Sequence, residues 1–216
     1  MFFNKAKKIG RNCALVITPF ATSQMEDIKK SLPNRQFSET EAIRCRFCLM
    51  ILNLVMAIWW INNLERNTNR ARKIIDSMVE TFNGAFERNS KPIRIGDFVT
   101  DPVEIALIDS AMGQVGVSKD TMSSFKSIIS TIYNNRVVSY MNAFNEVLTE
   151  LRREIGKPDF PQPAFFSQSA FSPVARLFVK HYTGDLWENH IDFATKLSSL
   201  LDTWNMTIYT IVKTLI

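Results

Sequence analysis

The pattern of apolar positions is dominated by residues 47–61, a run of fifteen residues in which Asn53 is the only polar side chain. Just upstream, Ser38 and Glu41 have the spacing of a capping box, which predicts a helix over 39–64. A transmembrane helix needs about twenty apolar residues, and a helix that is apolar on every side is otherwise the centre of a bundle. We therefore expect a central core helix with a buried hydrogen-bond partner for Asn53, and membrane insertion is the alternative.

Helical signals continue along most of the chain. Asp101 and Pro102 are typical of a helix start, and no Gly or Pro interrupts the chain between Ser118 and Gly156. Only residues 90–100 indicate extended structure. The pattern predicts an all-α fold, an irregular helical bundle of about six or seven helices. Its expected helices cover residues 39–64, 69–88, 101–113, 119–155, 173–184 and 186–215, and those near 39–64, 119–155 and 186–215 form the core.

The first 25 residues contain no acidic side chain. Apolar residues recur there at helical spacing from Phe2 to Val16, which indicates a basic amphipathic helix. Two alternatives remain, an ordinary helix packed on the body and a targeting segment with a basic start and a short apolar run. Because Pro33 breaks the pattern, we expect a basic N-terminal segment, residues 1–36, followed by a single helical-bundle domain, residues 37–216.

The net charge of +5 belongs to the N-terminal fifth of the chain. Residues 1–46 hold nine basic and four acidic side chains, whereas residues 47–216 hold seventeen of each sign. A neutral body gives no reason to concentrate charge at one end for solubility alone. We therefore expect a surface contact through four residues, Lys5, Lys7, Lys8 and Arg11.

Cys45 and Cys48 form a Cys-x-x-Cys pair and are the candidate metal ligands. A zinc or iron–sulfur site needs further ligands, and a redox motif of this kind follows a strand. Here the pair lies inside a predicted helix. We interpret both residues as buried, inert thiols, and the odd total of three cysteines indicates a reducing compartment.

The two histidines, His181 and His190, are the candidate ligands for haem or another small molecule. A di-iron bundle would require Glu three residues before each of them, but Phe178 and Trp187 occupy those positions. No catalytic or nucleotide-binding motif occurs, so we expect no cofactor and no catalytic residue, although an enzyme is not excluded.

These observations favour a non-catalytic helical interaction or scaffold protein, cytoplasmic or peripheral to a membrane. Its expected partner is another protein or a second copy of the chain, with the basic N-terminal segment contacting that partner or an anionic membrane surface. The alternatives are a nucleic-acid-binding helical protein, and a haem or small-molecule carrier that uses the region of His181 and His190.

Overall fold

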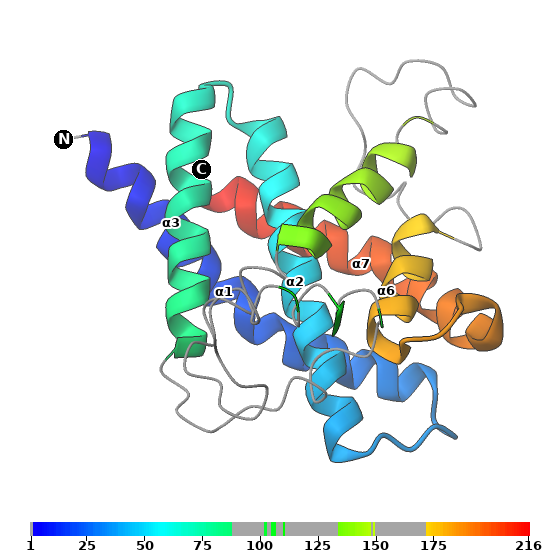
Figure 1. Cartoon of the computed structure of the whole chain (residues 1–216). Helices are drawn as coiled ribbons and strands as arrows, with labels where there is room; N and C mark the ends of the chain where they lie inside the picture. The colour runs from blue at the N-terminus through cyan, green and yellow to red at the C-terminus, as the bar shows by residue number, and fades with distance from the viewer. Residues whose placement is uncertain are drawn as a thin grey trace.

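The structure, a computed structural model, describes residues 2–87, 134–147 and 172–216, together with positions 102, 105, 106, 110 and 149. Its elements are α1 (Phe2–Ser31), α2 (Glu39–Leu64), α3 (Thr68–Glu87), α6 (Pro173–Thr183), the 3-10 helix η3 (Trp187–His190) and α7 (Ile191–Leu215). Residues 134–147 are also helical. The predicted all-α bundle is confirmed (Figure 1), and the described part contains no strand. The extended segment expected at 90–100 lies outside the described residues.

Helix α2 occupies the centre of the bundle. Ser38 caps it as predicted, since the Glu41 backbone N–H donates to Ser38 Oγ at 3.2 Å and the Ser38 N–H donates to Glu41 Oε2 at 2.9 Å. Every side chain of residues 47–61 except Met50 is buried, and α1, α3, α6 and α7 all contact the helix. In the described part, α2 alone is long and apolar enough to cross a membrane, and most of its apolar length is buried inside the bundle.

The single polar residue in the apolar run of α2 is fully paired. Asn53 Nδ2 donates to Gln24 Oε1, and Gln24 Nε2 donates to Asn53 Oδ1, both at 2.8 Å. Asn53 Nδ2 also donates to the Ile17 carbonyl at 3.2 Å. Both amide side chains are completely buried. The predicted hydrogen-bond partner of Asn53 is therefore confirmed, and it fixes the register of α1 against α2.

Helix α1 crosses α3 at very short range. A Cβ atom placed on Gly10 would lie 2.2 Å from the Ile74 carbonyl oxygen and 2.9 Å from the Met78 backbone nitrogen. Ser77 Oγ donates to the Lys7 carbonyl at 2.9 Å across the same crossing. The inner face of α1 belongs to the same core as the other helices, as the burial of Ala6, Ile9, Cys13, Ala14, Ile17 and Ala21 shows.

The interpretation of the N-terminal segment as an ordinary helix packed on the body therefore holds for the inner side of α1. The helix itself continues through Pro19 to Ser31. The boundary predicted between residues 36 and 37 falls in the connection from α1 to α2, and the division into two units stays a prediction. Val16, expected among the inward apolar positions, is 46% exposed, and Ile17 takes the buried position instead.

Helix α7 begins later than predicted. The sequence places a capping box at Asp185 and Glu188, but Asp185 Oδ1 accepts the Leu186 backbone N–H at 2.7 Å and an Asn189 Nδ2 hydrogen at 3.1 Å. This local turn is continued by η3, so α7 starts only at Ile191. The sequence predicts an inward face of α7 that continues from Phe193 to Leu215. Phe193, Leu197, Trp204 and Ile208 on that face are buried, whereas Leu200, Ile211 and Leu215 are only partly buried.

Candidate functional site

A cluster of polar side chains lies inside the bundle between α2, residues 134–147 and α6. Its centre is Arg136, whose side chain is completely buried. Arg136 Nη1 donates to Cys48 Sγ at 3.3 Å, and the guanidinium lies 5.6 Å from the centre of the Phe47 ring. Tyr140, one turn along the same helix, meets His181 edge to face with ring centres 5.3 Å apart. We call these four residues, Cys48, Arg136, Tyr140 and His181, the Arg136 cluster.

Burial keeps the side chains of His181 and Cys45 in their neutral forms. Burial, reinforced by the positive charges of Arg136 and Lys180, lowers the pKa of His181 to about 2. Burial also raises the pKa of Cys45 well above its usual range, with a smaller contribution from Cys48. The imidazole is therefore neutral and the Cys45 thiol is protonated at neutral pH, whereas the nucleophile and the metal ligand of cysteine chemistry is the thiolate.

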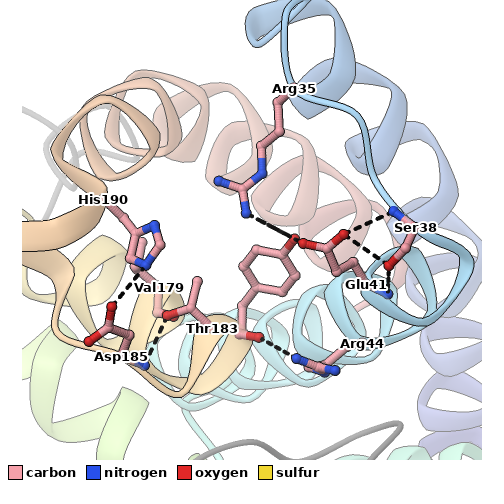
Figure 2. Close-up of polar contacts among 9 residues, drawn as sticks. Arg35, Ser38, Glu41, Arg44, Val179, Thr183, Asp185 and His190 are labelled. Atoms are coloured by element: carbon pink, nitrogen blue, oxygen red, sulfur yellow. Dashed lines mark hydrogen bonds and ion pairs between the residues drawn. The ribbon is translucent and has the colours of Figure 1, made fainter.

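The two candidate histidines lie in different surroundings. His181 is buried against Tyr140, whereas His190 lies half-buried at the start of α7, with its Nε2 atom 3.4 Å from Asp185 Oδ2 (Figure 2). No contact joins the two rings. Among the described residues, no group of three or more His, Cys, Asp or Glu side chains could hold a metal ion. Arg136 therefore contacts Cys48 and Tyr140 contacts His181, whereas His190 lies beside Asp185.

The neutral state of His181 makes the stability of the fold sensitive to acid. The unfolded chain has a histidine of ordinary pKa, near 6.5, and binds a proton that the folded chain excludes until about pH 2. Folding stability should therefore fall below pH 6.5, by up to about 1.4 kcal/mol for each pH unit. His181→Phe keeps a ring beside Tyr140 and removes this titration. Urea unfolding at pH 7.5, 6.0 and 5.0 should show a shallower loss of stability for His181→Phe, and parallel curves would contradict the assignment.

A second polar cluster holds the connection between α1 and α2 against α6. Arg35 Nη2 donates to the Tyr182 hydroxyl at 3.4 Å. The same nitrogen lies 3.7 Å from Glu41 Oε1, as Figure 2 shows. Its guanidinium lies within 5.6 Å of three ring centres, those of Phe37, Tyr182 and Phe193. Arg44 Nη1 donates to the Tyr182 carbonyl at 3.4 Å. These contacts anchor the connection between α1 and α2 against α6.

The outer face of α1 combines positive charge with exposed apolar surface. Lys5, Lys7, Lys8 and Arg11 are all exposed, and none of the ion pairs in the described part involves them. Leu15 is 60% exposed and Val16 is 46% exposed directly after them. Lys8, Arg11 and Leu15 follow one another at spacings of three and four residues, which places them on one side of the helix. We call these six residues, Lys5, Lys7, Lys8, Arg11, Leu15 and Val16, the α1 face.

Some residues of these sites could be recognised from the sequence and others could not. The four basic residues of the α1 face are visible as a cluster without acids, and all four are exposed in the structure, whereas the surface contact expected through them stays a prediction. Arg136 was missed, although its spacing of four residues from Tyr140 and eight from Phe144 puts it in line with their buried face. Tyr182 was missed as the partner of Arg35, since 147 residues separate them.

Comparison of the chain with models of known protein families, with curated proteins and with solved structures gave no match.

Proposed function

We propose that this protein is a non-catalytic helical interaction protein that attaches reversibly to anionic membrane surfaces through the α1 face. The observation that carries the proposal is the exposure of four cations beside two exposed apolar side chains on one helix. The bundle holds the opposite side of this helix in its core, so the face is presented on a rigid support. The buried, neutral state of His181 supports the non-catalytic part of the proposal.

The chemistry of the α1 face fits the surface of an anionic bilayer. Each basic residue near such a surface contributes about 1 kcal/mol, and this contribution falls as salt screens the charges. Leu15 and Val16 can enter the boundary between headgroups and acyl chains, as the apolar side of an interfacial helix does. Since α2 stays within the bundle in this proposal, attachment is peripheral. A peripheral protein of a reducing compartment would also keep its three cysteines free, as they are here.

Co-sedimentation with vesicles tests the proposal. The intact chain should bind vesicles of mixed phosphatidylcholine and phosphatidylglycerol at low salt, bind pure phosphatidylcholine weakly, and dissociate as salt rises. A quadruple variant with glutamine at Lys5, Lys7, Lys8 and Arg11 should lose most of this binding. Because four contributions of about 1 kcal/mol are removed, the expected decrease in affinity is on the order of a hundredfold or more. All four residues are exposed, so the variant should unfold at the same urea concentration as the parent.

A matched control variant shows whether vesicle binding depends on the position of the basic residues or only on the net charge of the protein. Its four substitutions to glutamine lower the net charge by the same amount at exposed basic residues on other elements, Arg66, Arg72, Lys196 and Lys213. The control should bind vesicles as the parent does. Equal loss in both variants would mean that only net charge matters, and the α1 face would have no special role. Binding to DNA or RNA that exceeds vesicle binding would favour the nucleic-acid alternative, and a bound chromophore would favour the haem carrier.

A further inference from the structure

A second exposed apolar patch lies at the turn between α6 and α7. Leu186 is 66% exposed and Ile191 is 49% exposed. Residues 185–192 contain Asp185, Glu188 and Asp192 and no Lys or Arg, so this segment carries a charge of −3 with His190 neutral. We call residues 185–192 the acidic corner. It repeats the composition of the α1 face with the opposite charge.

The local backbone holds the acidic corner in a defined shape. Helix α6 ends at Gly184, whose φ of 75° lies in the left-handed region that favours glycine. Asp185 then closes the turn with its own carboxylate by accepting hydrogens from Leu186 and Asn189. Asp185 is thus engaged in the turn, whereas Glu188 and Asp192 are exposed carboxylates next to Leu186 and Ile191 that take no part in closing it.

The cationic side chain of Arg176 lies beside the acidic corner. The guanidinium of Arg176 stacks over the Trp187 ring at 4.6 Å from its centre and reduces the local negative charge. The net charge of the acidic corner together with Arg176 nevertheless remains negative. The α1 face holds Lys5, Lys7, Lys8 and Arg11 and no acid, so its charge of +4 is opposite in sign to the charge of the corner.

The α1 face and the acidic corner cannot contact each other within one molecule. Figure 1 shows the N-terminal part of α1 and the turn between α6 and α7 on opposite sides of the bundle. Two complementary patches on one chain can pair only between copies, and the contact is then head-to-tail rather than symmetric.

We propose that the acidic corner of one copy docks on the α1 face of a second copy, with Leu186 and Ile191 meeting Leu15 and Val16 inside a ring of opposite charges. The proposal uses the surface on which the proposed function rests, but the association itself requires no membrane. It also makes the two contacts mutually exclusive. An anionic vesicle should separate the copies, because it occupies the α1 face that the acidic corner of the neighbouring copy would cover.

Charge reversal on each side separately tests the contact. The face variant carries Lys8→Glu and Arg11→Glu, and the corner variant carries Glu188→Lys and Asp192→Lys. In sedimentation velocity at low salt, the parent should show an association that grows with protein concentration. Each variant alone should associate about tenfold more weakly or not at all, because like charges then oppose each other across the contact. A control with Arg66→Glu and Arg72→Glu should associate as the parent does.

Mixing the two variants gives the decisive result. In an equimolar mixture, the intact corner of the face variant can meet the intact face of the corner variant, and the two reversed patches also match. Association should therefore return towards the parental level, because each pair of patches that meets between the two variants again carries opposite charges. A parent that stays monomeric, or a mixture no more associated than its components, would overturn the proposal. The corner variant keeps an intact α1 face and gains positive charge, so it should bind anionic vesicles at least as well as the parent does, and loss of that binding would count against the proposed function instead.

Discussion

Replacing Gly10 with alanine is expected to destabilise the protein by about 2–4 kcal/mol. The new Cβ atom would lie 2.2 Å from the Ile74 carbonyl oxygen and 3.0 Å from Ser77 Cβ, so α1 and α3 must move apart. Overpacking of a core typically costs about 1–3 kcal/mol, and here the obstructing atoms include backbone, which cannot rotate away. The gain in helix propensity on replacing glycine, about 1 kcal/mol, offsets only part of this. Urea unfolding followed by circular dichroism measures the difference.

Gly84 provides the control for this substitution. It also lies within a helix, α3, but a Cβ atom placed on it has no neighbour within 4 Å. Gly84→Ala should therefore be neutral or stabilise the protein by up to about 1 kcal/mol. A Gly10→Ala variant as stable as Gly84→Ala would show that α1 does not cross α3 as closely as described.

The buried amide pair of Gln24 and Asn53 is expected to show strong non-additivity. Asn53→Leu removes all three hydrogen bonds at once. It leaves the Gln24 amide without a partner in the core, and the Ile17 carbonyl keeps only its bond within the helix. Each buried group left without a partner costs about 1–3 kcal/mol, so the single variant should lose about 2–5 kcal/mol. Replacing both polar partners by apolar groups of similar shape costs far less.

The double variant Gln24→Leu with Asn53→Leu should consequently be more stable than Asn53→Leu alone. Unfolding free energies of the parent, both single variants and the double variant form a cycle that yields the coupling energy directly. We expect a coupling of at least about 1.5 kcal/mol, within the range observed for residues in contact. A coupling near zero would mean that Gln24 and Asn53 do not pair with each other.

The central helix could be predicted because its sequence signals are local. The capping box at Ser38 and Glu41 and the run from Phe47 to Ile61 need no knowledge of the rest of the chain. The need of Asn53 for a partner followed from the cost of burying an amide, but the identity of Gln24 did not. Gln24 lies 29 residues away on another helix, and only the packing of the two helices brings the amides together.

Other features escaped prediction for different physical reasons. Arg136 looks like a surface residue by composition, and its burial depends on Cys48 and Phe47 supplied by α2. The start of α7 was placed too early because Asp185 can cap a helix or close a turn, and nothing in the spacing from Asp185 to Glu188 distinguishes the two. Val16 and Ile17 are equally apolar, so the inner face of α1 could not be assigned without knowing how the helix meets α3.

The proposed attachment of the α1 face to a membrane would account for the combination of positive charge and exposed apolar residues on a helix whose other side is core. The explanation requires residue 15 itself to meet the bilayer, since Leu15 is the most exposed apolar residue of that face. A polarity-sensitive fluorophore attached at Leu15→Cys reports this contact. The native cysteines are buried, so the introduced thiol is the one that reacts readily in the folded protein.

We expect the emission of this label to shift to the blue with anionic vesicles, to return on addition of salt, and to change little with neutral vesicles. The same label at Val138→Cys, an exposed position on the helical segment 134–147, should not respond. No shift at position 15 in the presence of bound anionic vesicles, or equal shifts at both positions, would contradict the assignment of the α1 face as the membrane contact.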